Sequence, residues 1–365
     1  MAVLHFDGIL FIGFGGPTPG CCARFSPCPG TEALCFVKAI IGERRGAATR
    51  LAEVAAHYAH LGGFSPFNAL TVQQVHAVTA LLAAQGWPVP VRVGMRYWPP
   101  YVQDVLRDMA AQGQRHLLGV ILSPFQCQAS WEAYQQVVQD GLNTLGTQAP
   151  QITYLDPWPL HPGFIEAIAE SIRQAGAPLG ARRAQEAALI YTAHAIPASM
   201  AAEAPYTQQF AATAAAATQV LGRQQHHLAY QSQATGTPFP WLQPDINDAI
   251  QQVQAEGYRD VIVAPIGFLC DHVEKQITRV LSSFNPDAVI VNPPRIGLSS
   301  QVLNSLAESS ILKMTYISCN PTTLARDLAH LLNKGFTIES IRGFDMFPQT
   351  THVETLVELK KSPLI

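Results

Sequence analysis

Short apolar runs recur along the chain, and most of them are followed by a longer segment with helical periodicity. Three runs lie at residues 8–14, 89–94 and 116–122, and three more lie at residues 186–192, 227–231 and 259–265. Apolar runs that alternate with helices are typical of parallel strands covered on both faces. The pattern therefore predicts an α/β fold with two similar doubly wound parallel-sheet halves and a cleft between them.

The pattern is interrupted at residues 275–286 and then resumes. Strands are predicted at residues 287–291, 313–318, 336–342 and 352–359, with helices at residues 299–309 and 322–333. The composition also changes, because Ala, Gln, Pro and Trp are frequent before residue 275 and Trp is absent after it. We therefore predict three units, at residues 1–175, 176–280 and 281–365.

The composition favours a large soluble protein with a small-molecule partner. The 365 residues are 48% hydrophobic and 13% charged, and the net charge of -3 gives no general attraction to nucleic acid. The chain shows no secretory signal and no apolar run long enough to span a bilayer. We expect a cytoplasmic location, with peripheral contact at the inner membrane face and the oligomeric state left open.

Four of the seven cysteines lie close together near the start of the chain, at Cys21, Cys22, Cys28 and Cys35. They include no Cys-x-x-Cys pair and no matching second pair, which structural zinc and many iron–sulfur sites use. Free thiols are the default state in a reducing cytosol. We predict a Pro/Gly/Cys-rich loop at residues 18–34 that is neither a disulfide framework nor a metal site.

The first candidate site combines His194 and Glu274, each of which follows a predicted strand. Asp271 and His272 add titratable groups beside Glu274. Imidazole and carboxylate groups accept protons and bind divalent cations, and ligands of open α/β sheets bind beyond the carboxyl ends of the strands. A lone histidine at a strand end is more often structural, so the surrounding sequence decides the interpretation.

That surrounding sequence resembles ferrochelatase over about residues 5–275. The matching motifs occur in the family's order and are Gly13-Phe-Gly-Gly-Pro17, His57-Tyr58, Gly62-Gly-Phe-Ser65-Pro66, Gly94-Met-Arg-Tyr-Trp98, Leu122-Ser-Pro124, His194-Ala-Ile-Pro197, Tyr230-Gln-Ser232, Pro240-Trp-Leu242 and Asp271-His-Val-Glu274. The resemblance implies a lyase that inserts Fe2+ into a porphyrin in haem biosynthesis, within two parallel α/β halves around the porphyrin cleft.

The resemblance also assigns roles to residues. It implies that His194 and Glu274 are catalytic and handle the metal, and that Ser65 and Ser232 line the porphyrin pocket. Porphyrin and ferrous iron are then the substrates, and no cofactor is needed. Protoporphyrin and coproporphyrin are both left open as the substrate. The family continues past Glu274 with segments that close its second half, and here they are missing, so apolar surface on that half is expected to be covered by the tail or left exposed.

The second candidate site lies in the tail, whose residues 287–360 resemble RNA uracil-C5 methyltransferases. The motifs are Asn292-Pro-Pro-Arg295, Ser318-Cys319-Asn-Pro321, Asp345-Met-Phe-Pro348 and Thr351-His-Val-Glu354. The resemblance implies Cys319 as a nucleophile that adds to uracil and Glu354 as the base.

These motifs leave two alternatives to a chelatase. One is an RNA methyltransferase, for which S-adenosylmethionine and RNA would be the partners. The part of that fold that binds the methyl donor has no counterpart here, and Asn292 replaces an acidic residue. We therefore expect a partial Rossmann-like fragment that does not methylate RNA. An inactive fusion is the other alternative.

Overall fold

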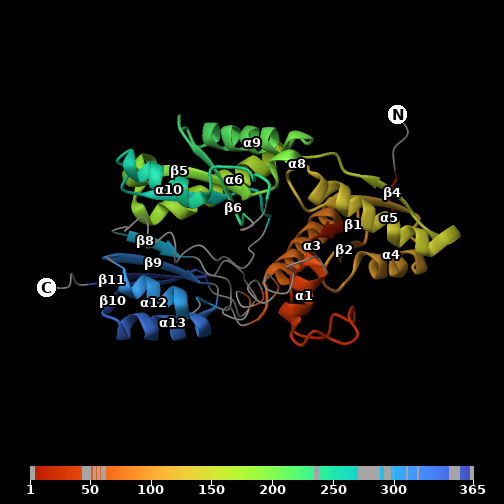
Figure 1. Cartoon of the computed structure of the whole chain (residues 1–365), viewed down its shortest axis with the longest axis horizontal. Coiled ribbons are helices and arrows are strands. Elements are labelled where there is room, and N and C mark those ends of the chain that lie inside the picture. Colours follow the sequence, from red (N-terminus) through yellow and green to blue (C-terminus); the bar gives the residue numbers. More distant parts are fainter. Residues whose placement is uncertain are drawn as a thin grey trace.

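The computed structural model describes residues 5–42, 51, 55, 58, 63–233, 238–269, 288–291, 297–298, 300–309, 311–318, 320–344 and 354–361. Figure 1 shows helices packed around separate sheets, which gives the chain a mixed α/β architecture. Two of the sheets are parallel and the third is mixed. In this described part of the chain no helix is both long and apolar enough to cross a membrane.

The first sheet has four parallel strands in the order β2-β1-β3-β4. Its strands are β1 (Gly8–Gly13), β2 (Val91–Met95), β3 (His116–Ile121) and β4 (Gln151–Tyr154). The associated helices are α1 (Glu32–Ile41), α3 (Phe67–Ala84), α4 (Val102–Ala111), η1 (Gln128–Glu132), α5 (Ala133–Leu145) and η2 (Gly146–Gln148). Strand β1 is buried along its whole length, because Leu10 and Ile12 pack with α4 and α5 while Ile9 and Phe11 pack with α3.

The second sheet has three described strands, and its longest strand is central. Strand β5 (Ala188–His194) lies between β6 (His227–Gln231) and β7 (Val261–Pro265), and all three are parallel. Its helices are α6 (Pro162–Gly176), η3 (Ala177–Leu179), α7 (Ala181–Glu186), α8 (Ala198–Ala202), α9 (Tyr206–Val220) and α10 (Ile246–Ala255). One face of β5 packs with α6 and α9 and the other packs with α10, which explains its continuous burial.

The two parallel sheets differ at one edge. In each, the first strand along the chain lies between the next two, but the first sheet has a further strand, β4, beyond β3. Among the described residues, no strand pairs with the outer edge of β7. Burial alternates along β7, and Val263 at its centre is 39% exposed. Whether the tail covers the apolar surface of the second half stays a prediction.

The C-terminal unit comprises the third sheet, in the order β10-β11-β9-β8, and two helices. These elements are β8 (Ala288–Val291), α12 (Ser300–Glu308), β9 (Lys313–Ser318), α13 (Pro321–Asn333), β10 (Phe336–Phe344) and β11 (Glu354–Lys361). Strands β8 and β9 are parallel, whereas β11 is antiparallel to both of its neighbours. The unit has a core of its own, in which Tyr316, Leu306 and Val357 are fully buried.

Several elements differ from the sequence-based expectation. The loop expected at residues 18–34 ends early, because α1 begins at Glu32 and the side chain of Thr31 accepts a hydrogen bond from the Leu34 amide at its N-terminus. Strand β4 and helix α6 had no predicted counterpart. Helix α6 lies within the predicted first unit, yet its residues Ile165 and Ile168 pack in the core of the second sheet. The unit boundaries themselves stay a prediction.

Candidate active site

His194 is the last residue of β5, at the carboxyl edge of the second sheet. Its backbone is fixed on two sides. It pairs with Gln231 at the end of β6, and its carbonyl accepts a hydrogen bond of 2.9 Å from the hydroxyl of Tyr206 in α9. The next amide, of Ala195, donates to the Gln231 carbonyl at 2.8 Å. Because β5 is the buried central strand, the backbone of His194 is held rigidly. It lies at the edge where ligands of such sheets bind.

The hydrogen bonding of the imidazole determines which nitrogen can act. Nδ1 of His194 lies 2.6 Å from the carbonyl oxygen of Ala195. A carbonyl only accepts, so Nδ1 carries the hydrogen and, in the neutral ring, Nε2 has the free lone pair. Burial of the ring within the surrounding protein lowers the pKa of His194 below its ordinary value, and the bond to Ala195 partly opposes this shift. The residue as a whole keeps exposed surface, and the lowered pKa favours the neutral imidazole at pH 7.

The chain that leaves β7 passes close to His194. The amide of Gly267 donates to the Thr192 carbonyl at 3.2 Å, and a Cβ at Gly267 would lie 2.9 Å from the Cα of Ala193, so a side chain is not accommodated there. The ring of Phe268 lies 6.4 Å from that of His194. One residue later, the Leu269 carbonyl accepts from Nε2 of Gln74 in α3 at 3.0 Å. The segment that precedes Glu274 therefore links the His194 edge to a helix of the first sheet.

The glycine-rich loop after β1 lies at the corresponding edge of the first sheet. Gly15 has a φ of 89°, and a Cβ at Gly16 would lie 2.7 Å from the Cβ of Ser65. Ser65 is 6% exposed. Its amide donates to the Pro17 carbonyl at 2.8 Å, and its Oγ accepts from the Phe67 amide at 3.2 Å at the start of α3. In this structure Ser65 therefore joins the loop to α3.

The structure places the other predicted site residues as follows. Ser232 directly follows β6, is exposed and has a φ of 64°. Because β6 pairs with the end of β5, Ser232 and His194 share one edge of the sheet. Glu274, with Asp271 and His272, lies outside the described residues. The assignment of Ser65, Ser232 and Glu274 to porphyrin or metal contacts stays a prediction.

The expected free thiols are present near the start of the chain. Cys21, Cys22, Cys28 and Cys35 are all free. Among the described residues, no group of three or more His, Cys, Asp or Glu side chains has a geometry that could hold a metal ion. That the cysteine-rich segment is not a metal site stays a prediction.

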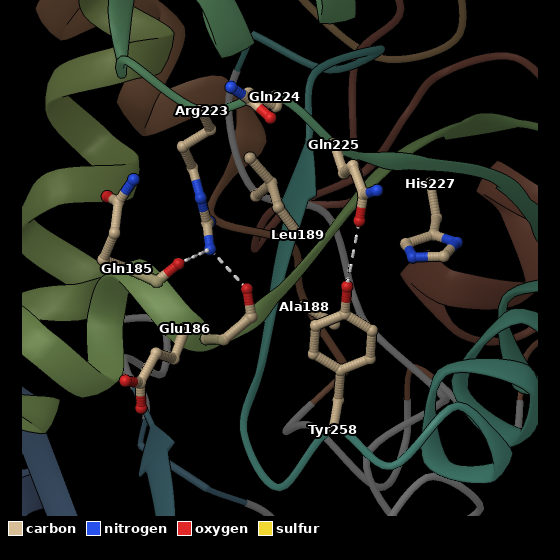
Figure 2. A pocket seen from close by; sticks show the side chains of 10 residues that line it. Gln185, Glu186, Ala188, Leu189, Arg223, Gln224, Gln225, His227 and Tyr258 are labelled. Atoms are coloured by element: carbon tan, nitrogen blue, oxygen red, sulfur yellow. Dashed lines mark hydrogen bonds between the residues drawn. The ribbon is translucent and has the colours of Figure 1, made fainter.

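A polar pocket of about 360 Å³ lies at the opposite, amino end of the second sheet, and sequence reasoning did not identify it (Figure 2). The guanidinium of Arg223 donates to the carbonyls of Gln185 and Ala187, at the end of α7. On the other side, the Tyr258 hydroxyl donates to Oε1 of Gln225 at 3.3 Å. Cations favour the carboxyl end of a helix, so Arg223 has a structural role there, and the pocket is separate from the His194 edge.

In the C-terminal unit, the ladder pairs the start of β11 with the end of β9. Strand β11 begins at Glu354, and Thr355 pairs with Ser318 at the end of β9. Asn320 caps α13, because its Oδ1 accepts from the Thr322 amide at 3.0 Å. Cys319 lies outside the described residues, as does Asn292. The register nevertheless joins the sequence neighbours of Cys319 and Glu354 at one end of the sheet.

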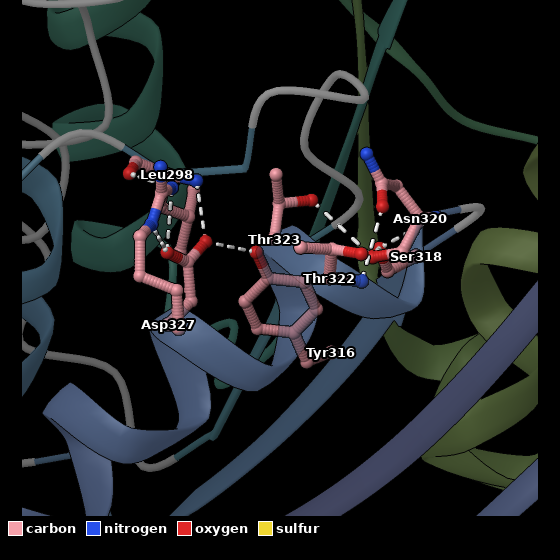
Figure 3. A network of polar contacts seen from close by, with 8 residues as sticks. Leu298, Tyr316, Ser318, Asn320, Thr322, Thr323 and Asp327 are labelled. Atoms are coloured by element: carbon pink, nitrogen blue, oxygen red, sulfur yellow. Dashed lines mark hydrogen bonds and ion pairs between the residues drawn. The ribbon is translucent and has the colours of Figure 1, made fainter.

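A buried carboxylate beside this turn is the main feature that sequence reasoning missed (Figure 3). Asp327 of α13 is fully buried. Its Oδ2 accepts from the Leu298 amide at 2.6 Å and from the Tyr316 hydroxyl at 2.5 Å, and its Oδ1 accepts from Arg326. Burial and the neighbouring Asp327 raise the pKa of Tyr316. An aspartate within the apolar stripe of α13 was the available sequence signal.

Comparisons with known proteins divide the chain close to residue 275, where the sequence pattern is also interrupted. The ferrochelatase family model matches residues 34–277, and the tRNA (uracil-5-)-methyltransferase family model matches residues 272–362. A coproporphyrin III ferrochelatase of Mycolicibacterium smegmatis is 32% identical over 274 residues, which are 74% of this chain and 78% of that protein. A ferrochelatase of Rhodopirellula baltica is 32% identical over 270 residues, covering 74% of each chain.

Among solved structures, a tRNA (uracil-54, C5)-methyltransferase of Pyrococcus abyssi in complex with S-adenosyl-L-homocysteine is 33% identical to the matched part. The match covers 30% of this chain but only 24% of that one, with a TM-score of 0.21, which is too low to support an argument about the fold. The ferrochelatase match, by contrast, spans most of this chain. The chain therefore belongs to the ferrochelatase family and carries a C-terminal segment that is similar to tRNA uracil-5-methyltransferases.

Proposed function

We propose that this chain inserts ferrous iron into a porphyrin in haem biosynthesis, with His194 as a base at the edge of the second sheet. The observation that carries the proposal is the state of the imidazole. Its Nδ1–H donates a hydrogen bond to the Ala195 carbonyl at 2.6 Å, and burial favours the neutral form of the imidazole. A neutral Nε2 on exposed surface is what a proton acceptor needs.

The chemistry of metallation requires such a group. A free-base porphyrin carries two N–H protons, and both leave as the metal takes their place between the four nitrogens. His194 Nε2 accepts one proton, and its lowered pKa lets it release that proton to water afterwards. In this proposal Glu274 is the second proton and metal-handling group, and Ser65 and Ser232 line the porphyrin pocket. Ferrous iron is a substrate, so no resident cofactor enters the reaction.

The arrangement of the sheets supports a cleft between two related halves. In both parallel sheets the first strand along the chain is central, so its carboxyl end lies between the ends of two neighbours. The hydrogen bond of 3.0 Å from Gln74 to the Leu269 carbonyl joins the two sides beside His194. We infer that the halves are versions of one doubly wound unit and that the porphyrin enters between them. Cytoplasmic location, with or without peripheral membrane contact, belongs to the same proposal.

The test is metal insertion by the purified full chain under anaerobic conditions. Coproporphyrin III and protoporphyrin IX are supplied separately with Fe2+, and the loss of porphyrin fluorescence is followed. We expect His194→Ala to slow insertion by about 100-fold or more, in the range typical of a general base. His116→Ala is the matched control, because His116 is an exposed residue at the amino end of β3.

Each outcome has a defined meaning. A His194→Ala protein that keeps its thermal unfolding midpoint but loses activity supports the proposal. Insertion at the unaltered rate in His194→Ala would remove the proposed base. Faster insertion into one of the two porphyrins would identify the preferred substrate. Insertion into neither porphyrin by the unaltered chain would favour the inactive fusion.

The C-terminal segment does not provide a second activity in this proposal. The family model of the methyltransferases matches only residues 272–362, and the described third sheet has four strands. Methyl transfer needs nucleophile, base, donor and uracil positioned together. S-adenosylmethionine and RNA would be partners only if the segment, with Cys319 and Glu354, proved to be active.

A further inference from the structure

Three cysteines converge where the segment after β1 meets α1: Cys22 and Cys28 precede the helix and Cys35 lies in it. The Sγ atoms of Cys28 and Cys35 are 3.6 Å apart, and the thiol of Cys22 also interacts with that of Cys35. Cys28 is exposed, whereas Cys22 and Cys35 are each 3% exposed. The family match begins at residue 34, so two of these three thiols precede it and are not accounted for by the chelatase reaction.

Hydrogen bonds to aromatic side chains hold this segment in place. The Tyr101 hydroxyl donates to the Cys22 carbonyl at 3.0 Å, and Nε1 of Trp98 donates to Oγ1 of Thr18 at 2.8 Å. On the other side, the cap at Thr31 starts α1 and places Cys35 in its first two turns. Cys28 and Cys35 are therefore kept close by two separate anchors, and only a small movement of Cys28 is needed to join them.

We propose that Cys28 and Cys35 form a reversible disulfide in the presence of a peroxide, and that Cys22 is a third thiol able to exchange with it. The exposed Cys28 attacks the peroxide, becomes a sulfenic acid and releases one water. Cys35 then attacks the sulfenic sulfur, forms the S–S bond and releases a second water. Two thiols and one hydrogen peroxide thus give one disulfide and two waters.

The surroundings of Cys35 determine how this pair responds. Burial, together with the adjacent thiols of Cys28 and Cys22, raises the pKa of Cys35 to about 12. The Cys35 thiolate is therefore scarce at pH 7, and its attack on the sulfenic sulfur should be faster at higher pH.

Oxidation at this place reaches the candidate active site through packing. Cys35 and Cys22 belong to the same buried cluster as Trp98 and Phe36. The backbone of Trp98 lies against the glycine-rich loop, since a Cβ at Gly15 would be 3.1 Å from the Trp98 nitrogen. A bond between Cys35 and Cys28 therefore restricts the movement of the buried cluster that contains Trp98, and Trp98 packs against the glycine-rich loop.

Tryptic mapping tests the pairing directly. Trypsin cuts after Arg24 and Lys38, so the peptide 25–38 contains Cys28 and Cys35 as its only cysteines, whereas Cys21 and Cys22 lie in peptide 1–24. The reduced full chain is treated with hydrogen peroxide at pH 7 and pH 8, alkylated with iodoacetamide, digested and analysed by mass spectrometry. We expect peptide 25–38 to appear without alkyl groups and lighter by two hydrogen atoms, and to form faster at the higher pH.

Matched variants and reduction complete the test. Dithiothreitol before alkylation should restore the doubly alkylated peptide, Cys28→Ser should abolish the intrapeptide bond, and the exposed neighbour variant Cys21→Ser should leave it unchanged. Full alkylation of peptide 25–38 after peroxide would overturn the proposal. A cross-link between peptides 1–24 and 25–38 as the stable product, or an irreversible sulfonic acid at Cys28, would equally overturn the assigned pair.

Discussion

Replacing Asp327 with alanine is expected to destabilise the C-terminal unit by roughly 2–6 kcal/mol. The carboxylate is fully buried and accepts from the Leu298 amide at 2.6 Å and from the Tyr316 hydroxyl at 2.5 Å. Alanine leaves both donors buried without an acceptor, and each such loss costs about 1–3 kcal/mol. Arg326 is 56% exposed, so water can replace its partner and its contribution is small.

Hydrogen exchange measured by mass spectrometry is the appropriate assay. All five tryptophans precede residue 242, so tryptophan fluorescence does not report on the C-terminal unit. A loss of 2–6 kcal/mol should accelerate exchange of the protected amides in β9 and β11 by about 30-fold to about 10⁴-fold, if they exchange through opening of the unit. Exchange in β1 and β5 should stay unchanged, because those strands lie in other cores.

The control is Glu339→Ala, which removes an exposed carboxylate from the same unit. Glu339 makes an ion pair of 3.9 Å with Lys360, and its side chain is 47% exposed, so the effect should stay below about 1 kcal/mol. If Asp327→Ala accelerated exchange in β9 and β11 no more than Glu339→Ala, the reasoning that buried donors need this carboxylate would be refuted.

Four further predictions concern the rest of the chain. The lowered pKa of His194 means that kcat/KM for metal insertion should be retained at pH 7 and lost only as the pH falls below about 6.5; an acid limb above pH 7 in the pH–rate profile would contradict this. Arg223→Met removes the donor to two carbonyls at the end of α7 and should lower the free energy of unfolding by about 1–3 kcal/mol, measured by urea titration; an unchanged midpoint would exclude the structural role. Gly16→Ala puts a Cβ 2.7 Å from that of Ser65 and should cost about 1–3 kcal/mol, whereas an equal melting temperature would show that the loop can relax. The chain is expected not to methylate RNA, so isothermal titration with S-adenosylmethionine should give no micromolar binding. Tritium release from uracil-containing RNA that disappears in Cys319→Ala would contradict this expectation.

The sequence could predict the elements whose hydrophobic pattern is strong and continuous. Residues 187–191 form an unbroken apolar run, and β5 is buried over all but its last residue, so both the strand and the position of His194 at its end could be inferred. Strand β4 has only four residues, and its burial alternates between exposed and intermediate. It lies at an edge of the sheet with little apolar surface, so no local pattern marks it.

The details of the site depend on contacts between distant residues. Which nitrogen of His194 is free follows from one carbonyl, that of Ala195, and no sequence pattern specifies that geometry. The link from Gln74 to the Leu269 carbonyl joins residues 195 positions apart. Asp327 likewise binds the amide of Leu298, 29 positions away. Such pairs follow from the tertiary fold, whereas periodicity reports only on which face of an element is buried.

The bare edge of β7 has a consequence for handling the protein. Within the described part of the chain, its backbone groups have no partner strand on that side, and on one face of the strand Val263 exposes apolar surface. An unpaired strand edge is a template onto which a strand from another molecule can add. Recovery should therefore fall as the protein is concentrated, and dilution, low temperature or a chaperone during expression should improve the yield more than any change to the buried core.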